Sequence, residues 1–525
     1  MIKHRSGISL HRRQGLRRPG TLAILMRPLL TGVLALAAGC AAVGPDYTVP
    51  PGQLADRWQA AVPHGASTAT LLDWWRSFND PALDTLLRAA QTDNPTLDQA
   101  AAAIASARAN LGEANAQALP GVNASANSTR SGSFRASATN PSPATEAAIA
   151  SSGLVGQSGT SSVRSGGFDA SWEIDLFGAV RRSKEAANAR LQARQADWHD
   201  ARVSLAAEVA TGYVDYRACQ MLAESQRVNL QSLRQSATST QVAADNGLRA
   251  PADAMLANAA LASASVTLNI QQAECELQVK ALVALTGIEE IALRRTLAAG
   301  PAALPAPALL NVDLLPVQLL SQRPDLVAAE RSLAAASADI GVAQANRYPR
   351  LSLLGSVAIG RTETSGLSIP TSPWSFGPSL SLPVFDGGAL RAQVAGKRAS
   401  YDAALANYRA AVRNAVKETE QSLVRLDAAA RRSDDVASSA RDYRRYFDAA
   451  QENWRAGGIS LLTLEEARRN QLTAEQNAIG SQRDRVLYGI ALYKALGGGW
   501  STDTTAAAKA AAPSLPEPYR NGVPQ

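Results

Sequence analysis

An internal duplication constrains the fold of this 525-residue chain more than any other feature of its sequence. Pro95 stands at the start of an alanine-rich segment that stops at Pro120, and Pro324 stands at the start of another that stops at Pro349. The two starting prolines, and likewise the two stopping prolines, are 229 residues apart. A repeat on this scale predicts two equivalent halves, each built as helix, strand, loop, strand, long helix, turn, long helix.

The last part of each half predicts an unusually long helix. Residues 178–245 and 388–456 contain no proline, and at about 1.5 Å per residue each would extend roughly 100 Å. The turns that follow, 246–248 and 457–459, correspond at an offset of 211, because the first half carries the longer loop. Apolar residues recur at steps of seven, four and three, as in Val394, Tyr401, Leu405, Tyr408 and Val412. This spacing, with alanine on the other faces, predicts coiled packing against more than one neighbour.

Shorter segments with a two-residue period predict strands. Residues 168–176 and 374–384 alternate apolar and polar side chains, residues 351–359 repeat the pattern, and 122–128 show it weakly. Strands of about nine to eleven residues suit a tilted crossing of a bilayer, with apolar side chains toward lipid and polar ones toward a lumen. An ordinary half-buried sheet alternates in the same way. The membrane is favoured by an aromatic residue near each strand end, namely Phe168, Phe177, Trp374 and Phe385.

Four strands cannot close a barrel, and an open sheet edge is not tolerated in lipid. If these strands lie in a membrane, several chains must therefore share one barrel. The connecting segments 129–165, rich in Ser, Ala, Thr and Gly, and 361–372 fit outward-facing surface loops.

The first 39 residues read as a secretion signal. They hold seven basic side chains and no acidic one, and an apolar stretch from Leu29 to Ala38 precedes Gly39-Cys40. Met26 is an alternative start. The run Leu36 to Cys40 resembles a bacterial lipobox, in which the cysteine is acylated; an ordinary cleavage site is the alternative. Without this leader the chain has 45 basic and 45 acidic residues, so its charge predicts no nucleic-acid partner.

The remaining residues offer little chemistry. His64 and His199 lie in unrelated segments, and no nucleophile elbow, P-loop or metal-ligand cluster is present, so we expect no enzyme, cofactor or metal. No segment after the leader has 18 consecutive apolar residues, which excludes a transmembrane helix. Cys219 and Cys275 would lie at similar heights in a helical hairpin. A disulfide needs Cα atoms within about 7 Å, closer than typical helix axes, so two free thiols are expected and a bond stays open.

Two short segments carry a resemblance to a known family. Residues 44–47, Gly-Pro-Asp-Tyr, and residues 492–500, Leu-Tyr-Lys-Ala-Leu-Gly-Gly-Gly-Trp, resemble the signatures of TolC-type outer membrane efflux proteins, most of all the OprM/NodT-like lipoproteins. The resemblance implies a mainly α fold with β, in a homotrimer. Three chains give four strands each to a 12-stranded outer-membrane β-barrel, continued by a long periplasmic α-helical barrel. It also implies a lipid anchor at Cys40 and contact with outer membrane lipid.

The resemblance further assigns sites near the two turns. They would be periplasmic tips that dock on a periplasmic adaptor (membrane fusion) protein through Gly247, Leu248, Arg249, Gly458, Ile459 and Ser460. Leu462 would be a hydrophobic constriction and Glu466 an acidic ring at the closed end of the pore, where the family usually has aspartate. Asp253 occupies the matching place after the first turn and is a weaker candidate. A solvated helix carboxylate is the alternative reading of Glu466.

The resemblance thus implies an outer membrane factor, a passive exit duct for drugs or other small toxic compounds, served by an inner-membrane RND transporter. The alternative is the duct of an ABC-driven type I secretion system, and the cargo stays unspecified. We expect a signal peptide at 1–39, a lipidated segment at 40–83, repeats at 84–300 and 301–500, and a disordered tail at 501–525.

Overall fold

The computed structural model describes residues 42–50, 57–61, 71, 74–132, 160–307, 310, 322–364 and 367–500. The predicted signal peptide, the lipidation site Cys40 and the predicted tail lie outside these residues. Two compact units make up the chain: the first holds 115–183 and 339–395 together with the segment up to Pro45, and the second holds 46–114, 184–338 and the residues from 396 onward. Each unit therefore takes segments from both predicted repeats.

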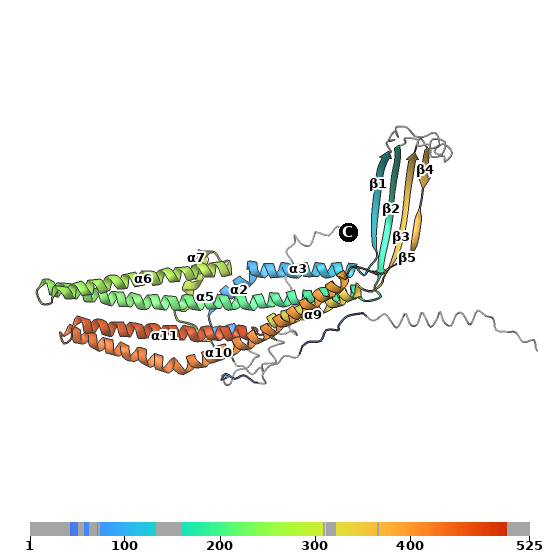
Figure 1. Cartoon of the computed structure of the whole chain (residues 1–525). Helices are drawn as coiled ribbons and strands as arrows, with labels where there is room; N and C mark the ends of the chain where they lie inside the picture. The colour runs from blue at the N-terminus through green and yellow to red at the C-terminus, as the bar shows by residue number, and fades with distance from the viewer. Residues whose placement is uncertain are drawn as a thin grey trace, which may run out of the picture. The chain divides into compact units, whose positions relative to one another are not determined.

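The first unit contains an antiparallel sheet (Figure 1). Its strands follow in the order β1, β2, β3, and β4 and β5 both pair with the free edge of β3. Every pairing runs without a change of register, from Gly121 opposite Ser171 to Arg350 opposite Ser381. The bounds are β1 Gly121–Gly132, β2 Thr160–Ile174, β3 Arg350–Thr364, β4 Leu367–Thr371 and β5 Trp374–Ser381.

β1, β2 and β3 are longer than the sequence pattern predicted, whereas β5 ends at Ser381, before the predicted end at residue 384. β1 and β2 extend into the segment 129–165, and β3 and β4 occupy most of 361–372, both of which were expected to be loops. Phe168 consequently lies in the middle of β2 and not near its end, so that part of the aromatic-end argument is wrong. The missed residues are mostly Ser, Thr, Gly and Arg, whose strand propensity is weak and whose conformation is fixed by pairing with neighbouring strands.

The structure adds one strand that was not predicted, which makes five strands instead of four in the described part of the chain. β5 corresponds to the predicted strand 374–384, and β4 lies within the predicted loop 361–372. β4 and β5 follow one another along the same edge of β3 and are separated by Ser372 and Pro373. Ala358 of β3 still donates a 3.0 Å backbone hydrogen bond to the carbonyl of Pro373. Proline has no N–H to return the second bond, so the ladder is interrupted there.

Helices at corresponding positions of the two predicted halves have equal lengths. α3 (Pro95–Ala116) and α9 (Pro324–Ala345) have 22 residues each, and α5 (Ala179–Asp245) and α10 (Ala389–Arg455) have 67 residues each. The long helices match the predicted segments to within a residue. No helix of the described residues is both long and apolar enough to cross a membrane.

In the second unit, α5 forms a hairpin with α6 (Pro251–Thr286) and α10 forms one with α11 (Leu461–Ala495) (Figure 1). Three shorter elements pack near the other ends of α6 and α11, namely the 3-10 helix η2 (Trp74–Phe78), α2 (Pro81–Thr92) and α7 (Glu290–Ala299). Their buried apolar side chains form the largest core of the chain together with those of α5, α6 and α11.

A buried polar network fixes α2 against α5 and α7. The carboxylate of Asp80 caps α2 by accepting the N–H of Ala82 at 3.0 Å, and the hydroxyl of Tyr213 donates to the same carboxylate. Arg217 donates to the Tyr213 oxygen at 2.9 Å and to the Leu297 carbonyl at 2.8 Å. Burial is the largest cause that raises the pKa of Tyr213, followed by its bond to Asp80, so the phenol keeps its proton.

The two cysteines are bonded, against the expectation of free thiols. Cys219 of α5 and Cys275 of α6 form a disulfide with Cα atoms 5.5 Å apart. Small residues allow the two backbones to approach this closely: Ala218 is buried beside Cys219, and Gly212 leaves room for Leu282 of α6. The typical axial separation used in the sequence argument therefore does not apply to these helices.

Candidate functional site

The sheet of the first unit has one wholly apolar face over most of its length. The register places Ala124, Phe168, Val357 and Trp374 in one row across the four strand positions. The next row holds Val122, Ala170, Gly355 and Phe376, and the rows beyond it add Trp172, Ile174, Leu351, Leu353 and Leu380. Every apolar position that the alternation had singled out on these strands falls on this face.

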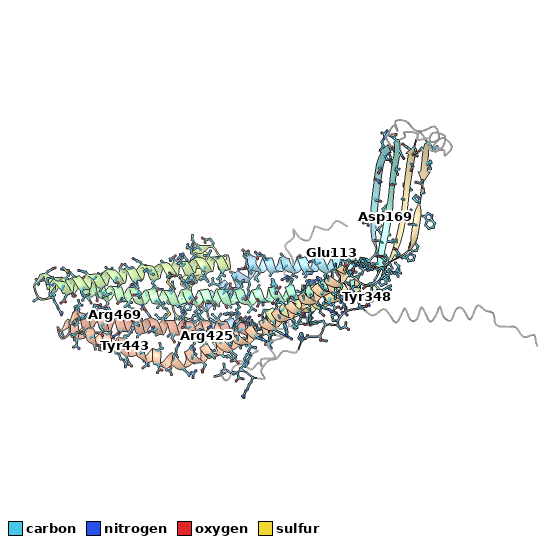
Figure 2. All side chains as sticks on the ribbon, in the orientation of Figure 1. Glu113, Asp169, Tyr348, Arg425, Tyr443 and Arg469 are labelled. Carbon is cyan, nitrogen blue, oxygen red and sulfur yellow. A yellow bond between two sulfur atoms is a disulfide. The ribbon has the colours of Figure 1, made fainter. Side chains whose placement is uncertain are left out.

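The opposite face is polar. Asn123, Asp169, Ser356 and Ser375 form one of its rows, in which the hydroxyls of Ser356 and Ser375 are 2.8 Å apart. Figure 2 marks the position of Asp169 on the sheet. Most other residues of this face are polar or small, and the apolar exceptions are Leu354, Val163, Ile369 and Leu367.

Neither face is covered by the residues that the structure describes. No residue of the five strands is buried, and Trp374 is 78% exposed on the apolar face. From the Leu351 row to the Ile359 row the apolar face extends over eight residue steps of β3, or about 27 Å along the strand at 3.4 Å per residue. On strands tilted by about 40° this length gives a band roughly 20 Å tall, close to the apolar band of outer-membrane barrels, about 25 Å.

The outer edges of the sheet are open within the described chain. β1 pairs only with β2, and β4 and β5 pair only with β3. Because Ala358 and Pro373 form a hydrogen-bonded pair, Pro370 and Pro378 stand at the alternate positions, where the backbone nitrogen points away from β3. The sheet of this chain therefore loses no hydrogen bond to β3 at these two prolines.

Each hairpin turns on one left-handed glycine. In the first turn Gly247 has φ 75°, and Leu248 N–H donates to the Ala243 carbonyl at 2.8 Å. In the second turn the left-handed residue is Gly457, with φ 82°, and Gly458 N–H donates to the Asn453 carbonyl at 2.8 Å. Sequence comparison had paired Gly247 with Gly458, which is one residue too late.

The correction changes which residues are equivalent. α5 starts at residue 179 and α10 at 389, and α6 starts at 251 and α11 at 461. Equivalent residues of the two hairpins are therefore 210 positions apart, not 211. Asp253 then corresponds to Thr463, and Glu466 corresponds to Leu256. Asp253 is therefore not the counterpart of Glu466, although both lie in the first turns of their helices.

The predicted tip residues stand out from the turns. In the first turn Leu248 is 79% exposed, an unusual environment for leucine, and the neighbouring Gly247 is exposed too. In the second turn Gly458 is exposed. Arg249 and Ile459 are half-buried. Ser460 caps α11: its hydroxyl accepts the Thr463 N–H at 3.2 Å, which orients the first turn of that helix.

The two predicted gate residues share the exposed face of α11. Leu462 is 64% exposed, and Glu466 lies one turn later on the same side. Leu461, Leu464 and Ala467 occupy the buried side of this helix. Glu466 makes no ion pair and no side-chain hydrogen bond with the part of the chain that the structure describes. Leu462 and the unpaired carboxylate of Glu466 face outward together, so they could line a pore or contact a partner.

Sequence reasoning missed Arg468, which is 3% exposed. It forms an ion pair with Glu465 and donates to the hydroxyls of Ser236, at 2.9 Å, and Ser232, at 3.2 Å, on α5. Arg468 thereby joins the second hairpin to the first, a few residues from the turn. The available signal was periodicity, because an arginine continues the buried stripe set by Leu461 and Leu464.

Comparison with known proteins identifies relatives of similar length. A family described as outer membrane efflux protein matches residues 86–288 and 315–498. Nodulation protein T of Rhizobium leguminosarum bv. trifolii is 30% identical over 475 residues, with 89% of this chain and 96% of the relative covered. The solvent efflux pump outer membrane protein SrpC of Pseudomonas putida is 29% identical over 482 residues, covering 89% and 97%. The solved outer-membrane channel OprN is 30% identical with a TM-score of 0.73, covering 88% of this chain and all of that one.

Proposed function

We propose, from the premise that the chain belongs to the outer membrane efflux protein family, that three copies form the exit duct of a tripartite efflux pump. The observation that carries this proposal is the two-faced, uncovered sheet. An apolar face about 27 Å long along the strand suits lipid, and a polar face with Asp169 and rows of serine suits an aqueous lumen.

The open sheet edges support the trimer. In hydrocarbon every backbone N–H and C=O must be paired, so a sheet edge has to meet another strand. One sheet contributes four strand positions, with β4 and β5 sharing the fourth, and three sheets joined edge to edge would close a 12-stranded barrel. The long hairpins α5–α6 and α10–α11 of the three chains would form the periplasmic α-barrel.

Attachment to the outer membrane would have two components. The barrel provides the main hold, and an N-acyl and S-diacylglycerol group at Cys40 adds a second. These two groups together carry three acyl chains, which suffice for stable anchoring, so the lipid would add to the hold of the barrel.

The turns at Gly247 and Gly457 would be the docking surface for the periplasmic adaptor. An exposed apolar residue such as Leu248 gives that contact a hydrophobic centre, and the adaptor would in turn join the duct to an inner-membrane RND transporter. The relative SrpC is a solvent efflux pump outer membrane protein, which favours small-molecule export over the alternative, a duct for an ABC-driven secretion system.

The closed end of the duct would be formed by α11. In a threefold arrangement, three copies of Leu462 would narrow the pore and three copies of Glu466 would form an acidic ring, which favours cations and opposes anions. Opening would be an iris-like untwisting of the inner helices, which an adaptor drives only if it binds the open state more tightly. The family is one of channel proteins, and the duct itself would do no chemistry.

Planar-bilayer recording of the purified protein tests the duct and the gate together. Replacing Leu462 and Glu466 with alanine should raise the single-channel conductance, because it removes the constriction and the charge ring. Replacing Val266 and Ile270 with alanine is the matched control, since these exposed residues have the same spacing on α6. Wild-type protein that forms no channels contradicts the duct, whereas channels with unchanged conductance in the first variant contradict only the gate.

A further inference from the structure

Two arginines stand directly opposite each other near the loop end of the sheet. Arg164 of β2 pairs in register with Arg361 of β3, and both side chains are exposed. The alternation of the strands places both on the apolar face, in the row after Gly166 and Ile359. Like charges placed opposite on neighbouring strands repel each other, so this pair disfavours the sheet unless something neutralises it.

The described residues supply no neutralising partner for this pair. Neither arginine forms an ion pair or a side-chain hydrogen bond with the described residues. The next row on the same face holds one acid, Glu363, and one more base, Arg130, with Ser162 between them. This leaves the loop end of the apolar face with three positive charges and one negative charge.

The position of the two arginines along the strands indicates which ligand they would bind. The apolar band ends at the Ile359 row, and Arg361 lies two residues beyond it, about 7 Å farther along the strand. That is where the hydrocarbon of a bilayer gives way to its headgroups. Long basic side chains at this level keep their methylene stems on the apolar surface and hold the charged end among the headgroups. A guanidinium presents paired donors that match the oxygens of a phosphate.

We propose that Arg164 and Arg361 bind a phosphate group of an anionic outer-leaflet lipid, with Arg130 adding charge from the next row. The inference rests on the proposed function, since it needs the apolar face to lie in lipid and the loop end to lie at the outer surface. The occupant is a phosphorylated glycolipid headgroup, because the site is continuous with the lipid-facing band and both guanidiniums are free to reach one anion.

Native mass spectrometry of detergent-purified trimers, titrated with lipid A that carries two phosphates, tests this site. Wild-type protein should bind lipid A at least about tenfold more tightly than the double variant Arg164→Gln/Arg361→Gln, since each charge-assisted phosphate contact is lost. Lipid A without phosphates should bind both proteins equally. Arg350→Gln is the matched control, because Arg350 lies on the same strand but at its other end and on the polar face.

A second measurement separates ligand binding from a structural role. In lipid-free detergent, the single variants Arg164→Gln and Arg361→Gln should melt at or above the wild-type temperature, because each removes a repulsion. Lower melting temperatures would overturn the proposal, since the arginines would then stabilise the sheet by themselves. Equal binding of lipid A by wild type and the double variant would also overturn it.

Two further experiments identify the source of the phosphate and separate failure of this site from failure of the proposed duct. Inorganic phosphate that displaces lipid A at millimolar concentration would show a free-anion site and overturn the lipid assignment. Wild-type protein that inserts into phosphatidylcholine vesicles but ignores the phosphates of lipid A refutes this site and leaves the duct standing. Protein that fails to insert at all refutes the duct and the site with it.

Discussion

Cys219 and Cys275, which are 56 positions apart in the sequence, are joined across the first hairpin by a disulfide bond that closes a loop through the turn. The same loop contains Gly247 and the exposed Leu248. No bond of this kind joins α10 and α11, because neither helix contains a cysteine. The two hairpins therefore share a backbone plan but differ in how firmly their arms are connected.

Replacing both cysteines with serine should lower the stability of the folded chain by up to about 4 kcal/mol, the value expected from loop-closure entropy for this separation. The melting temperature of the purified protein, compared with wild type with and without a reducing agent, measures the effect. Under reducing conditions the melting temperatures of wild type and the double variant should be equal. Equal melting temperatures in the absence of reductant would show that the bond adds nothing to stability.

Arg468→Ala should lower the stability by roughly 3 kcal/mol, because it leaves Glu465 without its ion-pair partner and strips the hydroxyls of Ser232 and Ser236 of a donor. Arg469→Ala is the matched control: Arg469 is the next residue, is exposed and stands out from α11 (Figure 2). Thermal melting of the two variants should separate them clearly. Equal losses would mean that the buried contacts of Arg468 do not hold the hairpins together.

Tyr213→Phe should cost about 1–3 kcal/mol, since it removes the hydroxyl that donates to Asp80 and accepts from Arg217 while both partners stay buried. Tyr443→Phe serves for comparison, because Tyr443 is exposed on α10. Denaturant unfolding followed by circular dichroism gives both values. A loss no greater than that of the Tyr443 variant would contradict the view that this network fixes α2 against α5.

Glu466→Gln should reduce the preference of the channel for cations without widening it, because it neutralises the proposed acidic ring and keeps its size. The reversal potential across a KCl gradient in planar bilayers reports this preference. Glu452→Gln is the control, an exposed carboxylate on α10 that pairs with Arg455. If the Glu452 variant alone loses selectivity, the ring lies elsewhere.

His199 should make the protein less stable as the pH falls. Burial, followed by the charge of Arg202, lowers the pKa of His199 to about 4, below the usual value near 6.5. The unfolded chain takes up this proton first, so stability is lost between about pH 6.5 and 4. His199→Gln removes this contribution, and the difference in melting temperature between variant and wild type should change across that window. A constant difference at pH 7.5, 5.5 and 4.5 would refute the assignment.

The repeat and the helices could be predicted from the sequence because their signals are local and redundant. Sixty-seven residues without proline or a turn signal leave few alternatives to α5 and α10, and the alternation around Phe168 and Trp374 assigned the apolar face correctly. The strand ends could not be predicted, since 129–132 and 160–165 are extended only because they pair with neighbours. Their own side chains favour a loop equally well.

The site was predicted only in part. Leu462 and Glu466 do share an exposed face of α11, as their spacing of four residues requires. The left-handed glycine was assigned one residue late because Gly457 and Gly458 are adjacent, and only the backbone distinguishes them. The disulfide and the buried Arg468 depend on how closely α5 approaches α6 and α11, a distance that is set by packing and is not written in either helix alone.

The open edges of the sheet have a consequence for how such a protein would be made. A single chain that entered the bilayer alone would expose the free side of the 12-residue strand β1, and each unpaired backbone group costs several kcal/mol in hydrocarbon. A single chain is thus less stable in the membrane than in the periplasm, where water can pair with these backbone groups. Under the proposed function, partners must meet before or during insertion, so the rate of appearance in the membrane should depend steeply on the supply of new chains.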